Sequence, residues 1–209
     1  MQSKALPYYG QEPEIVAQNI VLYPSEMCFV QYLPIKMSKK EGLGVDHRVP
    51  ENLKWTQPLI DIVKPFIEEQ HYVYLTAKYL YVLPNNMGNR AGWHCDGFLT
   101  SDINYIWTDN FDTHFAIQHF DLSQDCDLSI EQMNKQVYPH NIVTYGVNNL
   151  IKLDQYNVHR SPVEGQAMRA FVKISVSEER YNLQGNAHNY LFDYLWDMKI
   201  RSEKRNHPY

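Results

Sequence analysis

The hydrophobic residues of the stretch 55–71 recur every three or four positions, as they do on one face of an α-helix. These residues are Leu59, Ile60, Val63, Phe66 and Ile67. Pro58 falls in the first turn, where a missing amide donor is tolerated, whereas Pro65 should bend the helix. The pattern therefore predicts a bent helix over residues 55–71.

The next stretch, residues 72–83, has the period of two that is typical of a β-strand. Tyr74, Thr76 and Lys78 alternate with a more apolar set, and turn-forming residues 84–88 follow. Further short strands are predicted at 18–23, 28–33, 113–122, 141–145, 150–153 and 169–176, and further helices at 130–135 and 190–200. Many short strands broken by turns predict a mainly β fold, a sandwich or barrel with flanking helices.

The composition agrees with this outline. The chain has 209 residues, of which 44% are hydrophobic and 21% are charged, as in ordinary globular proteins. It contains 16 Tyr, 8 Phe and 4 Trp, and aromatic residues of this kind favour sheets. Because no repeat or linker divides the sequence, we expect one domain over residues 1–209.

Charge and cysteine content narrow the range of functions. The net charge of −5 makes nucleic acid an improbable partner, because phosphate binding needs clustered Lys and Arg. The three cysteines, Cys28, Cys95 and Cys126, lie far apart, which is typical of a reducing compartment. No apolar run reaches the roughly 18 residues of a membrane span. We therefore expect a cytoplasmic protein without a membrane partner.

The segment His94-Cys95-Asp96 offers two metal ligands. In extended backbone, residues i and i+2 project to the same side, so an imidazole and a carboxylate can reach one ion. A third ligand would complete the two-His-one-carboxylate set that suits Fe(II) in oxygen chemistry. A second pair, His119 and Asp121, has the same spacing but lies within an apparent strand, and it is the alternative.

The third ligand is best sought at His159, ten residues before Arg169. Arg169 opens a predicted strand whose even-numbered residues are apolar, whereas Phe171 and Lys173 share its own face. An arginine that faces the inside of a barrel needs an anion, because an unpaired buried charge is costly. A carboxylate ligand would supply that anion.

The order and spacing of His94, Asp96, His159 and Arg169 resemble the Fe(II)/2-oxoglutarate-dependent dioxygenase superfamily. The resemblance covers about residues 72–176, the catalytic core. Residues 150–169 are similar to the family's strand, distal histidine, Pro-Val turn and arginine. Tyr79 and Tyr81 resemble the strand before the first histidine in the prolyl-hydroxylase-like and nucleic-acid-demethylase-like branches.

Two departures from the family pattern concern the cosubstrate. The gap from Tyr81 to Pro84 is longer than the common one, and Arg169-Ala170-Phe171 lacks the Arg-x-Ser of plant-type members. The resemblance itself implies that Arg169 is the partner of the distal carboxylate of 2-oxoglutarate. Tyr81 or Tyr79 would assist, and Lys173 is an outside candidate.

The resemblance also implies a fold and an activity. The fold would be a double-stranded β-helix, the cupin-like jelly roll, and Fe(II) would bind His94, Asp96 and His159. With 2-oxoglutarate and O2, the protein would hydroxylate a small molecule or a protein side chain. Two alternatives remain: a cupin-like metal-dependent enzyme that does not use 2-oxoglutarate, and a jelly-roll binding protein. The sequence does not indicate an oligomeric state.

Overall fold

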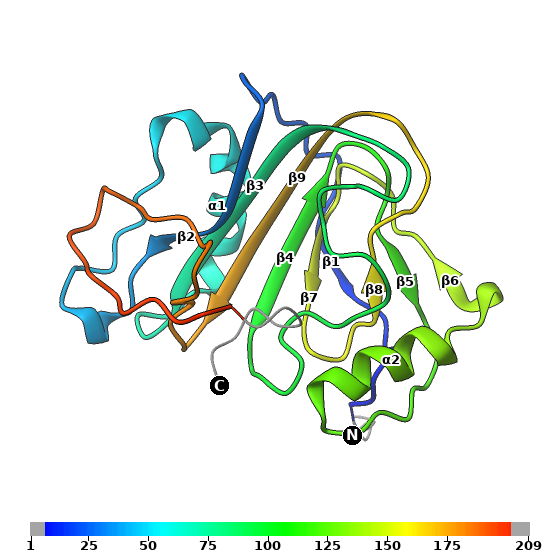
Figure 1. Ribbon diagram of the computed structural model, residues 1–209. Helices are drawn as coiled ribbons and strands as arrows, with labels where there is room; N and C mark the ends of the chain where they lie inside the picture. The colour runs from blue at the N-terminus through cyan, green and yellow to red at the C-terminus, as the bar shows by residue number, and fades with distance from the viewer. Residues whose placement is uncertain (1–6, 202–209) are drawn as a thin grey trace, which may run out of the picture.

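The computed structural model describes residues 7–201, which form antiparallel β-strands with a few short helical segments (Figure 1). The strands are β1 (Glu14–Ala17), β2 (Cys28–Lys36), β3 (Tyr72–Val82), β4 (Ile103–Thr108), β5 (His114–Ala116), β6 (Ile142–Val143), β7 (Leu150–Leu153), β8 (His159–Arg160) and β9 (Ala167–Ser177). The helices are α1 (Gln57–Val63) and α2 (Cys126–Gln136), with 3-10 turns η1 (Lys39–Glu41), η2 (Glu51–Thr56), η3 (Lys64–Phe66) and η4 (Pro139–Asn141). The predicted fold class, mainly β with flanking helices, is confirmed.

The strands form two sheets that share a jelly-roll topology. The larger sheet has the order β1-β7-β4-β9-β3-β2, and the smaller sheet, at the right of Figure 1, has the order β6-β5-β8. From β3 onwards the chain passes back and forth between them. β3, β4, β7 and β9 join the larger sheet, whereas β5, β6, β8 and the bridge at His94 belong to the smaller one. This alternation is that of the predicted double-stranded β-helix.

One face of the larger sheet packs against α1 and forms the main hydrophobic core. Ala170, Val172 and Ile174 of β9 belong to it, as the alternation in the sequence predicted. The other buried members include Leu59, Ile60 and Val63 of α1, Val73 and Leu75 of β3, and Trp107 of β4. Burial of these side chains fixes the register of β9 and so decides which of its residues point the other way.

The opposite face of the larger sheet carries polar and charged residues. Thr76 of β3 pairs with Lys173 of β9, and Lys78 pairs with Phe171. Directly paired residues project to the same side of a sheet, so these four side chains lie together. Phe171 shares a hydrophobic cluster with Phe115 of the smaller sheet, which places this polar face between the two sheets. The candidate site lies in that interior.

Two predicted helices have different ends in the structure. The helix predicted over 55–71 is α-helical only in α1 and ends after η3. The reason is Pro65, which lacks an amide donor and crowds the carbonyl four residues earlier. The helix predicted over 130–135 is longer, because the Asp125 side chain caps α2 by accepting from the amides of Asp127 and Leu128.

The helix predicted over 190–200 and the strand predicted over 18–23 are wrong. Phe192 and Trp196 are buried four residues apart, which imitates a helical period, but both rings pack into a tyrosine-rich cluster. At Asn19 the φ angle is 58°, which interrupts extended backbone. The other predicted strands are present, although β5 and β6 are shorter than expected. Within residues 7–201 no helix has the length and hydrophobicity to span a membrane.

Candidate metal centre

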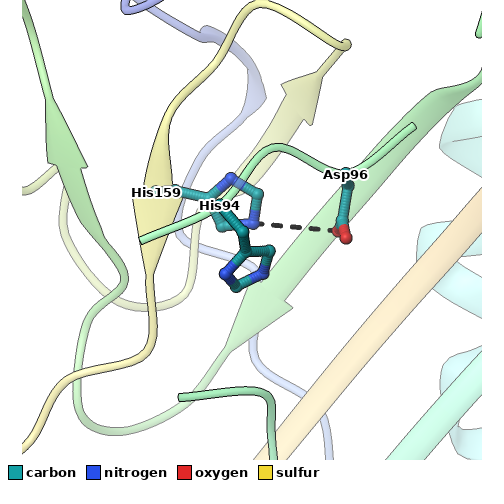
Figure 2. Close-up of side chains that lie close together, drawn as sticks. All are labelled: His94, Asp96 and His159. Carbon is teal, nitrogen blue, oxygen red and sulfur yellow. Dashed lines mark ion pairs between the residues drawn. The ribbon is translucent and has the colours of Figure 1, made fainter. Parts of the chain in front are cut away.

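Two histidines that are distant in the sequence meet at the edge of the smaller sheet, beside β8. The backbones of His94 and His159 form an antiparallel bridge with N–O distances of 3.0 and 2.9 Å. Asp96 follows two residues after His94, and Figure 2 shows its carboxylate turned toward the His159 ring. The distance from Asp96 Oδ2 to His159 Nε2 is 3.7 Å. The sheet topology therefore brings together the three side chains that the sequence singled out.

The cluster has the geometry of a small metal site. One ligand atom from each of His94, Asp96 and His159 lies within 4.8 Å of the other two. The two imidazole centroids are 4.6 Å apart, and both rings are buried. Two imidazoles and one carboxylate are the donor set of a facial metal site, so the cluster could hold a metal ion.

Backbone carbonyls fix the tautomer of both histidines. His94 Nδ1 lies 2.9 Å from the Gly92 carbonyl, and His159 Nδ1 lies 3.0 Å from the Asn157 carbonyl. A carbonyl oxygen can only accept, so each Nδ1 carries the proton and donates it. This leaves the Nε2 lone pair of each ring for a metal ion, in the arrangement that metal-binding histidines usually have.

Helix α2 is hydrogen-bonded to the backbone segment that carries His94. Asn134 of α2 accepts a hydrogen bond from the Trp93 amide and donates one to the Trp93 carbonyl, both at 3.0 Å. Gly92, with a φ of 77°, makes the turn into this segment, and an added Cβ would press on the Asn134 side chain. The position of His94 thus depends on a helix about 40 residues later in the sequence.

The electrostatic environment keeps both histidines neutral. Burial lowers the pKa of His94 to about 3, with His159 adding to the effect, and burial also lowers the pKa of His159. Burial by itself would raise the pKa of the Asp96 carboxyl. Lys173 and the two histidines outweigh this, and they hold that pKa well below its usual range. Neutral imidazoles and an ionised carboxylate are the forms that bind a metal ion.

Lys173 is the direct partner of Asp96. Its Nζ donates to Asp96 Oδ2 at 3.0 Å and to the Tyr32 hydroxyl at 3.0 Å. Lys173 and the Asp96 side chain are both largely buried, with exposed side-chain fractions of 10% and 16%. The lysine therefore orients the carboxylate and neutralises it when no metal ion is bound.

A cavity of about 280 Å³ opens beside the cluster and contacts all three of its side chains. The cationic residues of its wall are Lys78, Arg90, Lys173 and Arg201, and its other residues include Tyr32, Thr76, Ile106, Thr113, Ser161 and Phe171. Among the described residues of this wall, Asp96 is the one carboxylate. The cavity wall thus carries more cationic residues than carboxylates, which favours an anionic ligand.

Arg169 lies on the predicted face of β9 but not on the cavity wall. Its guanidinium is 5.2 Å from the Phe171 ring, and it donates from Nε to the Asn110 carbonyl and from Nη1 to the Met87 carbonyl. Its Nη2 is buried and has no hydrogen-bond partner. Burial lowers the pKa of Arg169 to about 10.

The two tyrosines expected near the cosubstrate point away from the cavity. Tyr79 packs on the main core, and Tyr81 is 54% exposed, with its hydroxyl accepting from Gln166. Strand alternation is the reason, because the inner positions of β3 belong to Thr76 and Lys78. The structure therefore places neither tyrosine on the wall of this cavity, and their part in cosubstrate binding stays a prediction.

The alternative pair also lies elsewhere. His119 stacks on Tyr8 with ring centroids 5.6 Å apart, and Asp121 is exposed. Sequence reasoning missed Lys78 and Tyr32 as cavity residues. The alternation of Thr76 and Lys78 in the predicted strand was a usable signal for Lys78. Tyr32 has no such signal, because it sits at an irregularity of β2 with a φ of 50°.

Comparison with known proteins adds a distant structural likeness. A scan against models of protein families finds no match, and a search of curated proteins finds none. Among solved structures, EvdO2 from Micromonospora carbonacea var. aurantiaca is similar with 18% identity and a TM-score of 0.37, over 59% of this chain and 64% of that one. The structure of EvdO2 complexed with 2-oxoglutarate is similar with 16% identity and a TM-score of 0.32, over 59% of this chain and 65% of that one. This chain therefore matches less than two thirds of EvdO2, at low identity.

Proposed function

We propose that this protein is a non-haem Fe(II)- and 2-oxoglutarate-dependent oxygenase that hydroxylates its substrate. The observation that carries the proposal is the convergence of His94, Asp96 and His159 at the wall of a cationic cavity inside a jelly roll. The three side chains, the cationic cavity and the fold are separate observations, and this chemistry requires a metal site beside a pocket for an anionic cosubstrate.

The donor set fits Fe(II). Two neutral imidazole nitrogens and one carboxylate oxygen suit a divalent ion of intermediate softness, and the set leaves coordination positions open for other ligands. The Nδ1 hydrogen bonds of His94 and His159 to backbone carbonyls hold both rings in the binding tautomer. In contrast to a structural zinc site, no cysteine thiolate takes part, since Cys95 contacts Met133 instead.

The charge of the cavity favours a doubly negative cosubstrate. Lys78 and Lys173 line it together with a single carboxylate, Asp96, and a divalent ion would add two positive charges. Excess charge in a buried site is costly unless it is paired. A dianion such as 2-oxoglutarate, with one end near the metal ion and the other near a cation, would offset it.

The residues of the chain would orient and shield the reaction. When bound, Fe(II) and 2-oxoglutarate activate O2 for hydroxylation of a substrate C–H bond, with CO2 and succinate as co-products. Lys173 fixes Asp96, the backbone carbonyls fix the two histidines, and Phe171 and Ile106 give the cavity wall an apolar part. A small molecule or a protein side chain would be the substrate, and the cationic wall disfavours one that is positively charged.

Anaerobic titration with Fe(II) and then with 2-oxoglutarate, followed by visible absorption, tests the proposal. We expect a weak charge-transfer band that needs both additions, and loss of most Fe(II) binding in Asp96→Ala but not in the control Asp121→Ala. If Fe(II) binds and 2-oxoglutarate does not, the cupin-like enzyme without 2-oxoglutarate replaces the proposal. If neither binds, the jelly-roll binding protein does.

A further inference from the structure

Three cationic side chains follow one another along the inner face of β3 and β9. Lys173 lies opposite Thr76, Lys78 lies opposite Phe171, and Arg169 lies opposite Leu80. Each step is two residues along the strand, which is about 7 Å. The three cations are therefore arranged in order of distance from Asp96, beginning with Lys173.

Lys78 is the cation of this row that lines the cavity and has only uncharged hydrogen-bond partners. Its Nζ donates to the Gly88 carbonyl at 2.5 Å and to Asn89 Oδ1 at 3.0 Å, and it lies 4.8 Å from the centroid of the Phe29 ring. None of these partners carries a negative charge. In the described part of the chain, no carboxylate forms an ion pair with Lys78.

Arg169 is less well placed to meet a ligand. Two of its nitrogens are taken by the carbonyls of Asn110 and Met87, and its remaining Nη2 has no accessible surface. A ligand in the cavity would have to displace the surrounding chain to reach Nη2. The bonds that Arg169 makes instead tie two loops to β9, which makes it a positioning residue for this end of the cavity.

We propose that Lys78, and not Arg169, binds the distal carboxylate of 2-oxoglutarate. The inference rests on the proposed function, because it assigns one end of the cosubstrate of that function. With the keto-acid end near His94, Asp96 and His159, the distal carboxylate lies one two-residue step further along the sheet. That step matches the length of an extended short-chain diacid, and it leads from Lys173 to the level of Lys78.

The titration of Lys78 supports this assignment. Burial lowers the pKa of Lys78 to about 7, and the neighbouring Lys173 and Arg169 add to the effect, whereas Asp96 opposes it. These are the charged groups that act on Lys78, and the cations outnumber the carboxylate. An anion bound at Lys78 would stabilise its charged form. Binding of 2-oxoglutarate above pH 7 should therefore be accompanied by uptake of a proton.

The first test compares two keto acids by anaerobic calorimetry with the Fe(II)-loaded protein. 2-Oxobutanoate shares the keto-acid end of 2-oxoglutarate but has no distal carboxylate. Wild type should prefer 2-oxoglutarate, and Lys78→Met should weaken 2-oxoglutarate about 10- to 100-fold, the usual contribution of a charge-assisted hydrogen bond. Binding of 2-oxobutanoate and of Fe(II) should change little, which also shows that the variant is folded. Lys78→Arg should retain part of the preference.

Arg169→Met is the comparison variant. If it abolishes the preference for 2-oxoglutarate while Lys78→Met keeps it, the assignment to Lys78 is overturned and Arg169 takes its place. The second test needs no variant: calorimetry of wild type at pH 8 in buffers of different ionisation enthalpy should show proton uptake, which would support the assignment. If wild type binds Fe(II) but neither keto acid, the proposed function itself fails.

Discussion

The ion pair between Lys173 and Asp96 gives a prediction about stability that does not depend on any ligand. In Lys173→Met the Asp96 carboxylate loses its direct partner, while the side chain keeps a similar length. The pair spans 3.0 Å, with exposed side-chain fractions of 10% and 16%. Removing one partner of a buried ion pair leaves an uncompensated charge and costs about 3–5 kcal/mol. For a chain of this size, that loss lowers the melting temperature by roughly 6–20 °C.

The control is the same substitution at a surface pair. Lys152 Nζ lies 2.9 Å from Glu14 Oε2, but the exposed side-chain fractions are 37% and 65%. Solvent already screens such a pair, so Lys152→Met should cost no more than about 1 kcal/mol. Thermal unfolding of both variants, in the presence of a chelator, measures the difference that burial makes.

Two further measurements on Lys173→Met separate charge from packing. Anaerobic addition of Fe(II) should recover much of the lost stability, because the ion supplies the positive charge that Asp96 has lost. The double variant Asp96→Asn/Lys173→Met should also be more stable than Lys173→Met, since it contains no unpaired carboxylate. The reasoning is refuted if Lys173→Met and Lys152→Met lose the same stability, or if neither Fe(II) nor Asp96→Asn restores any of it.

Three other predictions concern the fold around the site. Gly10 has a φ of 91°, and an added Cβ would meet the Gln118 backbone carbonyl. In urea denaturation, Gly10→Ala should therefore lower the free energy of unfolding by over 1 kcal/mol more, as a rough estimate, than Gly42→Ala. Tyr181 donates to Asp102 Oδ2 at 2.6 Å in a buried setting, and Tyr181→Phe should cost about 1.5–3 kcal/mol by the same assay; a neutral result would contradict this. His94 has its pKa lowered from 6.5 to about 3, so only the unfolded chain gains its proton below pH 6.5. Stability of the metal-free protein should therefore fall between pH 6.5 and 3, by at most about 1.4 kcal/mol per unit, and more gently in His94→Gln.

Local patterns in the sequence were sufficient for several features of this protein. The apolar and polar alternation of residues 169–176 predicted the two faces of β9, because a strand has only two sides and one of them must be buried. The spacing of His94 and Asp96 predicted that both side chains can approach one ion, because the direction of side chains two residues apart is set by the local backbone. The jelly-roll class followed from the number and spacing of short strands together with the family resemblance.

Contacts between distant segments decided the rest. The sequence contains two His-x-Asp pairs, and within residues 7–201 the bridge between His94 and His159 brings one of them to a second histidine. The sequence also did not show which cation lines the cavity, because Arg169 and Lys78 both lie on inner faces of their strands. Carbonyls of Met87 and Asn110 occupy Arg169, while Lys78 remains on the wall.

Residues 190–200 show that a local pattern can also predict an element that the structure does not contain. Their helical period predicted a helix over 190–200, but Phe192 and Trp196 are spaced for a tyrosine-rich cluster formed by β2, β3 and Tyr181. Sequence by itself determined properties that depend on neighbouring residues: the two faces of a strand, the turns, and the spacing that lets His94 and Asp96 approach one ion. Tertiary structure decided how His159 comes beside His94 and Asp96, which charged residues line the cavity and which path this stretch takes, because each depends on side chains brought together from distant parts of the chain.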